Sequence, residues 1–171
     1  MEQITQRFST NEKLIEEYMG GIMKSRTAKI SSVFPASIDE VWEKIQHLET
    51  LQYIAAPYAT FEPLDKNVFT WEEGVTTDYF FKLFGLFPFG KHSIKMIEFN
   101  KTKGLIYTNE KNKSVPVWNH TILLQQIEAC TTYYTDEVEI NAGWKTYFVY
   151  CWSILFYRHR QRKWLKLLGS K

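Results

Sequence analysis

Two polar residues within apolar runs are the strongest candidates for chemistry in this chain. Residues 117–124, VWNHTILL, place His120 between a tryptophan and aliphatic residues, and residues 131–140, TTYYTDEVEI, place Asp136 among aromatic and β-branched residues. Imidazole exchanges a proton near neutral pH, and a neighbouring carboxylate orients and charges it. The two residues are therefore a candidate catalytic acid–base pair or ligand anchor. The alternative is structural, because a buried polar group needs a partner whether or not it reacts.

The alternation of residue types predicts where these two side chains point. In a strand every second side chain lies on the same face. A hairpin that turns near Ala129 places His120 opposite Val138, with Asp136 one step along the same face. We expect the more apolar face of each run to point inward. These faces comprise Trp118, His120, Ile122 and Leu124 in the first run, and Tyr134, Asp136, Val138 and Ile140 in the second.

Capping, alternation and helix-breaking residues predict the remaining elements. Residues 26–34 form a first strand, and the S-x-x-E capping box at Ser37 begins a helix that a second short helix follows, ending near Pro57. Residues 143–168 form one long helix. Six strand-like runs lie between, at residues 59–64, 68–84, 91–99, 104–111, 117–128 and 131–140. The apolar stripe expected on the long helix comprises Trp144, Phe148, Cys151, Trp152, Leu155 and His159.

This order of elements predicts one α+β domain. A seven-stranded antiparallel sheet, strongly curved, wraps around the long C-terminal helix, and two short helices follow the first strand. Ser9 and Glu12 fit a further capping box, so an extra helix over about residues 10–19 precedes the domain. We assign residues 1–25 to an N-terminal helical extension and residues 26–171 to a ligand-binding domain. A ligand would lie between the sheet and the long helix.

Aromatic residues make up 16% of the chain, with 12 Phe, 10 Tyr and 6 Trp. This much ring volume predicts either a large aromatic-lined cavity or a solid aromatic core. The apolar segment 81–91 is a candidate lid or rim, or a hairpin that packs under the sheet. Arg160 could reach an acidic ligand or Asp136, although helical arginines are mostly surface residues. The candidate ligand-binding residues are Trp71, Tyr79, Phe81, Trp118, His120, Ile122, Tyr134, Asp136, Phe148, Trp152, Phe156 and Arg160.

The net charge is only +2, but the cations are unevenly placed. No acidic residue follows Glu139, whereas 7 of the 21 Lys and Arg residues do. A basic C-terminal end is typical of a solvated helix face. The alternative is a patch that binds nucleic acid or an anionic membrane.

Several classes of protein and site are disfavoured by what the sequence lacks. The N-terminus carries acidic residues in place of a signal-peptide core, and no apolar stretch is long enough to cross a bilayer. Cys130 and Cys151 lack metal-ligand spacing and are expected to be reduced, buried thiols of a soluble cytoplasmic protein. Phosphate-loop, nucleophile-elbow and zinc-hydrolase motifs are absent. We therefore predict no metal site and no cofactor.

At this point the chain resembles the START-like helix-grip (SRPBCC) superfamily, and within it a bacterial branch of the polyketide cyclase or dehydrase-like proteins. The resemblance covers about residues 26–168 and rests on the order of elements together with W-x-H at 118–120, T-D-x-V at 135–138 and F-Y-x-H-R at 156–160. It implies a deep cavity that binds an apolar or aromatic small molecule, but no particular reaction. Residues 1–25 lie outside it, and Ile140 replaces an aromatic residue common in relatives.

The sequence thus favours binding of a small hydrophobic molecule, aromatic or lipid-like, by a monomer or a homodimer. A first alternative is a cyclase, dehydratase or hydrolase that uses His120 and Asp136 as an acid–base pair. A second alternative is an interaction protein that binds nucleic acid or an anionic membrane through the basic end of its last helix. Binding of nucleic acid is the less favoured of these partners.

Overall fold

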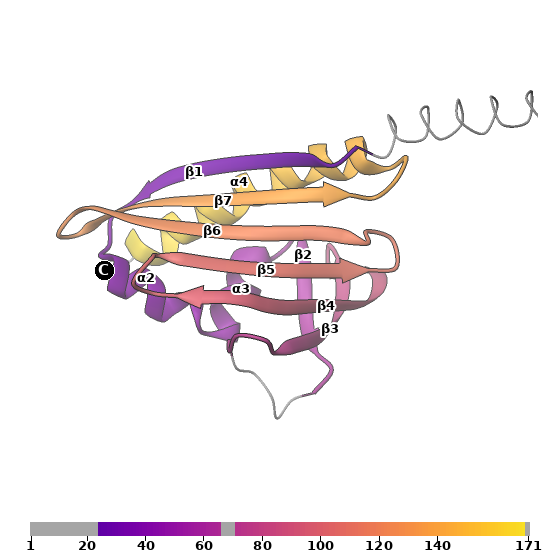
Figure 1. The fold of residues 1–171 in the computed structure, drawn as a ribbon, viewed down its shortest axis with the longest axis horizontal. Helices are drawn as coiled ribbons and strands as arrows, with labels where there is room; N and C mark the ends of the chain where they lie inside the picture. Colours follow the sequence, from indigo (N-terminus) through magenta and orange to yellow (C-terminus); the bar gives the residue numbers. More distant parts are fainter. Residues whose placement is uncertain (1–23, 66–70, 170–171) are drawn as a thin grey trace, which may run out of the picture.

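Seven antiparallel strands form one open sheet in the order β1-β7-β6-β5-β4-β3-β2. The structure is a computed structural model, and it describes residues 24–65 and 71–169 (Figure 1). The predicted fold class is confirmed, with six strands after the pair of short helices. The strands are β1 Arg26–Phe34, β2 Ala59–Pro63, β3 Thr76–Leu83, β4 Phe87–Asn100, β5 Leu105–Asn112, β6 Val117–Glu128 and β7 Thr131–Asn141.

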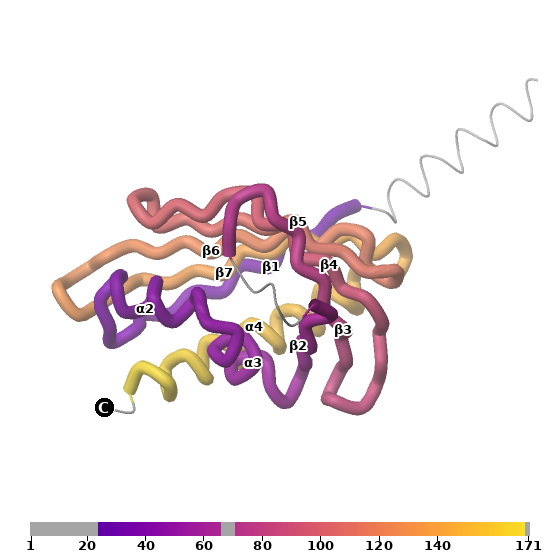
Figure 2. Tube along the Cα trace, turned by 90° about the horizontal axis from the view of Figure 1, so that it is seen from below, coloured from indigo at the N-terminus to yellow at the C-terminus, as the bar shows by residue number. Residues whose placement is uncertain are grey.

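All three described helices lie on one side of the sheet, which curves over them (Figure 2). They are α2 Ile38–Ile45, α3 Leu48–Ala55 and α4 Thr146–Gly169. The Ser37 side chain caps α2 by accepting a hydrogen bond from the backbone N–H of Glu40, as the capping box predicts. Register shifts within the β3–β4, β4–β5 and β6–β7 pairs bend the strands and add to the curvature.

The β6–β7 hairpin has the predicted register. His120 lies opposite Val138, and Ile122 lies opposite Asp136. On its other side β7 pairs with β1, where Ile30 faces Asp136. Asp136 is therefore held in an interior strand and is fully buried. The two inward faces predicted from alternation are confirmed, since all eight of their residues are buried.

The structure corrects the predicted buried face of the last helix. Trp144 precedes α4 and is 70% exposed, Phe148 is 68% exposed, and Leu155 is also exposed. The first half of the helix carries aromatic residues all around its axis, so periodicity alone did not select a face. Packing of the helix against the sheet selects the face instead. The buried face of α4 comprises Thr146, Ser153, Phe156, Tyr157, Arg160, Gln161, Trp164 and Leu168.

Three smaller predictions also change. Cys130, in the β6–β7 turn, and Cys151, on the outer side of α4, are exposed thiols and not buried ones. Residues 71–75 are not part of a strand, so β3 is shorter than the predicted run 68–84. In contrast β4 begins at Phe87, four residues before the predicted run 91–99. The positive φ of Gly90 and the adjacent bulge let the strand continue through residues 87–90, which lie between the two predicted runs. The predicted helix 10–19 lies outside the described residues.

Candidate functional site

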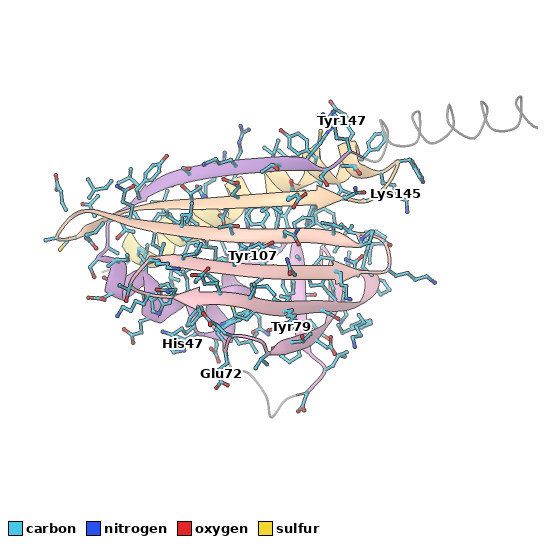
Figure 3. The ribbon with its side chains drawn as sticks, viewed as in Figure 1. His47, Glu72, Tyr79, Tyr107, Lys145 and Tyr147 are labelled. Atoms are coloured by element: carbon cyan, nitrogen blue, oxygen red, sulfur yellow. The ribbon has the colours of Figure 1, made fainter. Side chains whose placement is uncertain are left out.

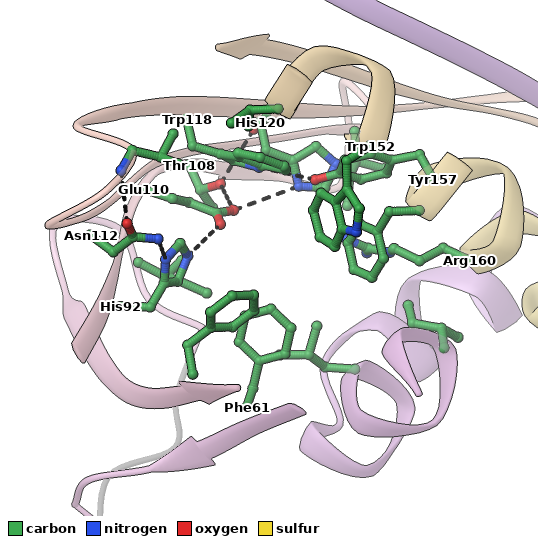
Figure 4. Close-up of a pocket in the computed structure, with 18 of the residues that line it drawn as sticks. Phe61, His92, Thr108, Glu110, Asn112, Trp118, His120, Trp152, Tyr157 and Arg160 are labelled. Atoms are coloured by element: carbon green, nitrogen blue, oxygen red, sulfur yellow. Dashed lines mark hydrogen bonds and ion pairs between the residues drawn. The ribbon is translucent and has the colours of Figure 1, made fainter. Parts of the chain in front are cut away.

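A cavity of about 720 Å³ lies between the concave face of the sheet and the helices α3 and α4. Figure 4 shows part of its lining. A volume of this size is typical of pockets that hold a drug-sized molecule. Most of the wall is apolar, and it includes Leu51, Ile54, Phe61, Trp71, Phe81, Ile94, Met96, Ile106, Val115, Ile122, Trp152 and Phe156.

A chain of polar side chains crosses the sheet side of this cavity, beginning at Asn112 on β5. The Oδ1 atom of Asn112 accepts hydrogen bonds from the backbone N–H groups of Ser114 and Val115, each at 2.8 Å. This fixes the orientation of the amide, so that Nδ2 of Asn112 donates to Nδ1 of His92 at 3.3 Å. The Nε2–H of His92 then donates to Oε2 of Glu110 at 3.0 Å.

Glu110 connects the two histidines of the chain. Its Oε1 atom accepts a hydrogen bond from the hydroxyl of Thr108 at 2.8 Å and lies 3.7 Å from Nδ1 of His120. The other ring nitrogen of His120, Nε2, donates to Oδ1 of Asp136 at 2.8 Å. Each nitrogen of His120 thus faces a carboxylate. The ring satisfies both only when both nitrogens carry protons, which makes His120 an imidazolium.

Asp136 ends the chain with both oxygens engaged. Its Oδ1 atom also accepts from the Tyr134 hydroxyl at 3.0 Å, and its Oδ2 atom accepts from Nε2 of Gln161 at 3.1 Å. Gln161 lies on α4 and also donates to the backbone carbonyl of Ile30 at 2.8 Å, and it accepts from the Ser32 hydroxyl at 2.6 Å. These bonds attach the long helix to β1, an edge strand, and to the neighbouring strand β7.

Opposing effects set the charges of the buried chain. Burial lowers the pKa of His120, but the hydrogen bond to Asp136 and the nearby Glu110 carboxylate outweigh it, so that this pKa is raised. Burial raises the pKa values of both carboxyl groups, but nearby cations and hydrogen-bond donors outweigh burial. His120 and Arg160 lower the pKa of Asp136, and His120 and His92 lower the pKa of Glu110. Both carboxylates are therefore ionised. His120 and Arg160 supply two positive charges that balance them.

This geometry bears directly on the predicted acid–base pair. His120 and Asp136 do lie together, in hydrogen-bond contact. However, Nε2 is held by Asp136, and Nδ1 lies 3.7 Å from a Glu110 oxygen, beyond hydrogen-bond distance, so a bound molecule would compete with Glu110 for the Nδ1–H group. The arrangement of His120 is that of a buried ion cluster, and a catalytic role for the pair stays a prediction.

The structure brings most of the predicted ligand-binding residues to one cavity. Tyr79 and Asp136 do not line it, since Tyr79 packs edge-on against Phe61 within the core and Asp136 lies behind His120. Those found in its lining are Trp71, Phe81, Trp118, His120, Ile122, Tyr134, Phe148, Trp152, Phe156 and Arg160.

Sequence reasoning missed His92 and Glu110, which both line the cavity and are buried. The available signal was alternation, because Ile106, Thr108 and Glu110 share one face of β5. Finding the pair also requires the β4–β5 register, in which His92 faces Asn112 and Ile94 faces Glu110. That register includes a bulge, which residue types alone do not locate.

Exposed aromatic residues surround the end of the cavity where α4 begins. Figure 3 shows Lys145 and Tyr147 at this end of the molecule. Trp144, Lys145 and Phe148 contribute to the cavity lining, as does Phe89 from the other side on β4. The segment 81–91, expected to be a lid, a rim or a packed hairpin, forms the β3–β4 hairpin, and its Phe84, Leu86 and Phe87 side chains are exposed.

No group of three or more His, Cys, Asp or Glu side chains in residues 24–65 and 71–169 is arranged to hold a metal ion. Within the same ranges, no helix combines the length and apolar character needed to cross a bilayer.

The ion cluster makes the stability of the fold depend on pH. The pKa of His120 is raised above 6.5, so its contribution is complete below pH 6.5 and is lost as the pH rises through the raised value. The pKa values of Glu110 and Asp136 are lowered from 4.5 and 3.8, so their contributions are complete above those values and are lost on acidification. The cluster therefore stabilises the fold most between pH 4.5 and 6.5.

We expect the free energy of unfolding, measured by urea titration, to decline as the pH rises above 6.5. The loss amounts to about 1.4 kcal/mol for each unit by which the pKa of His120 is raised. Ring ¹⁵N chemical shifts of His120 at neutral pH should be those of an imidazolium. A neutral ring together with stability that increases toward alkaline pH would contradict the assignment.

Comparison with known proteins agrees with this architecture. A family model described as a domain of unknown function (DUF8410) matches residues 32–167. No curated protein sequence matches the chain.

Solved structures share the fold at low sequence identity. Norcoclaurine synthase from Thalictrum flavum, in complex with dopamine and hydroxybenzaldehyde, superposes with a TM-score of 0.62 and 11% identity over 86% of this chain and 88% of its own. Protein CV1439 from Chromobacterium violaceum superposes with a TM-score of 0.64 and 15% identity over 83% of this chain and 96% of its own. Ara h 8.0201 superposes with a TM-score of 0.57 and 8% identity over 84% of this chain and 99% of its own. The structural neighbours are Bet v 1-like, SRPBCC-fold proteins, and the predicted helix-grip fold is confirmed.

Proposed function

We propose that this chain, which belongs to the DUF8410 family of domains of unknown function, binds a small hydrophobic molecule, aromatic or lipid-like, between its sheet and α4. The observation that carries the proposal is the cavity of about 720 Å³ with predominantly apolar walls. A cavity with such walls gains free energy when a ligand covers them, at roughly 25 cal/mol per Å² of apolar surface removed from water.

The polar part of the wall supports binding more than catalysis. The hydrogen bonds of the sheet network join its own members, from Asn112 to Glu110 and from His120 to Asp136, so the network holds charged groups in position without a ligand. An acid–base reaction through His120 would first have to open one of its two carboxylate contacts. We therefore rank the binding protein ahead of the enzyme.

The aromatic rim offers a route between solvent and cavity. Trp144, Phe148 and Phe89 line the cavity and are exposed, so a hydrophobic ligand meets apolar surface before it enters. Norcoclaurine synthase, a protein of the same fold, was solved in complex with two small aromatic molecules, dopamine and hydroxybenzaldehyde. At 11% identity that complex supports a ligand between sheet and helix here only by analogy.

Binding can be tested directly with purified protein. Native mass spectra of freshly prepared protein are expected to show a stoichiometric added mass that disappears on denaturation. In a second measurement, the protein is unfolded in urea, passed over a hydrophobic resin, refolded and titrated with the neutral fluorescent probe N-phenyl-1-naphthylamine. We expect saturable 1:1 binding with an increase in probe emission, as an apolar environment produces. Refolded protein that shows no saturable binding would contradict the proposal.

A further inference from the structure

Three buried hydrogen-bond donors on the long helix have no acceptor among the described residues. Nε of Arg160 and the indole Nε1 atoms of Trp152 and Trp164 are buried without a hydrogen-bond partner among the described residues. All three side chains line the cavity and all three belong to α4. The opposite wall differs, because the polar groups of the sheet network are paired with one another.

Arg160 is the most unusual of these residues. Its side chain is 7% exposed, and its guanidinium lies 4.9 Å from the ring centroid of Tyr157 and 5.7 Å from that of Phe156. The ion pairs formed in residues 24–65 and 71–169 do not include Arg160. A buried guanidinium carries a permanent charge and five N–H donors, and leaving such donors unpaired is costly.

The nearest candidate acceptor within the protein is already occupied. Burial lowers the pKa of Arg160, but the negative charge of Asp136 outweighs this and raises it, so the guanidinium stays charged. The two oxygens of Asp136, however, accept hydrogen bonds from His120, Tyr134 and Gln161. Asp136 therefore compensates the charge of Arg160 from a distance and leaves its N–H groups without an acceptor.

The side chains of Trp152 and Arg160 both contact the ring of Phe156. The indole of Trp152 stacks on Phe156 with ring centroids 4.8 Å apart, and the guanidinium of Arg160 lies over the same Phe156 ring. Figure 4 shows the side chains of Trp152 and Arg160 extending into the cavity from α4.

We propose that the ligand is a hydrophobic carboxylic acid whose carboxylate accepts hydrogen bonds from Arg160, with Trp152 as the second donor, while its apolar body fills the cavity. A carboxylate accepts hydrogen bonds and donates none, and its two oxygens match the planar fork of a guanidinium. The inference rests on the proposed function and adds the chemical class of the ligand. Both a fatty acid and an aromatic acid have this chemistry.

The experiment compares each acid with a neutral molecule of similar apolar size. Dodecanoate is paired with 1-dodecanol, and 2-naphthoate with methyl 2-naphthoate, and each displaces N-phenyl-1-naphthylamine from the refolded protein. We expect the acid to bind at least about tenfold more tightly than its neutral partner, as a charge-assisted hydrogen bond provides. The pair with the larger preference distinguishes a fatty acid from an aromatic acid.

Variants on the same helix locate the effect. Arg160→Met keeps an unbranched apolar side chain over Tyr157 and removes the donors, and it is expected to abolish the preference for acids while neutral molecules still bind. Arg158→Met is the matched control, because Arg158 is exposed and the same substitution there should change nothing. Trp152→Phe should weaken the preference to a smaller extent.

The possible outcomes separate the two proposals. Neutral molecules that bind as tightly as acids to the unaltered protein would overturn the carboxylate inference and leave the binding function standing. This comparison needs no variant, so it holds even if Arg160→Met fails to fold. Absence of displacement by any of the four molecules, with no binding of N-phenyl-1-naphthylamine itself, would overturn the proposed function.

Discussion

Replacing His120 by leucine is expected to lower the free energy of unfolding by about 3–5 kcal/mol, the range measured when one partner of a buried ion pair is removed. The substitution leaves Glu110 and Asp136 buried without the cation that lies between them. Leucine is close to imidazole in size, so the loss would reflect uncompensated charge more than an empty space. Urea titration near pH 6 measures it, since the native cluster is fully charged there.

A compensating variant separates charge from packing. Adding Glu110→Gln to His120→Leu removes one of the two buried negative charges and leaves Asp136 with Arg160 as its counter-charge, so the double variant should recover part of the lost stability. His47→Leu is the control, because His47 is exposed and makes no side-chain capping bond to α3, so its effect should stay within about 0.5 kcal/mol. A loss in His120→Leu no larger than in this control would show that the ion cluster contributes nothing to stability.

The predictable part of the site is the part formed by neighbouring segments of the chain. His120 and Asp136 lie on adjacent strands joined by a two-residue turn, so alternation and the position of the turn determine which residues face one another. The prediction of that register required no knowledge of the rest of the molecule.

The part of the site that could not be predicted from the sequence depends on tertiary packing. Glu110 reaches His120 through the β5–β6 pairing and His92 through β4–β5, where a bulge shifts the register. The buried face of α4 was also predicted wrongly, because Phe148 and Leu155 are as apolar as the residues that the sheet selects. The buried face carries Gln161, whose side-chain amide donates hydrogen bonds to Asp136 and to the backbone carbonyl of Ile30. Residue types alone do not reveal such partners.

The same limit applies to the cavity. A high aromatic content is compatible with a solid core and with an aromatic-lined space. The two outcomes differ in whether the sheet closes fully on the helix, which is a property of strand curvature. The structure separates the buried residues into two clusters, and the cavity borders both, with Trp71 packed against each.

Filling this cavity from the sheet side is expected to remove binding without unfolding the protein. Ile122 is 7% exposed and lines the cavity, so Ile122→Trp places a large ring in the space that the ligand would occupy. If the ring removes about 100 Å² of apolar contact, the loss is about 2.5 kcal/mol, which corresponds to about a seventyfold loss of affinity for N-phenyl-1-naphthylamine. The ring enters an existing space, so the cost of overpacking should be small.

The neighbouring residue provides a control that differs only in the face of the sheet. Leu123 is 40% exposed on the outer side of β6, so Leu123→Trp adds the same indole to the same strand without entering the cavity. Its affinity for the probe should equal that of the unaltered protein, and the urea midpoints of both variants show whether each is folded. Equal binding by both variants would place the probe outside the cavity, because an indole at Ile122 and a ligand between sheet and helix exclude each other. Loss confined to Ile122→Trp locates binding on the concave side of β6, the side that carries His120 and faces the donors of α4.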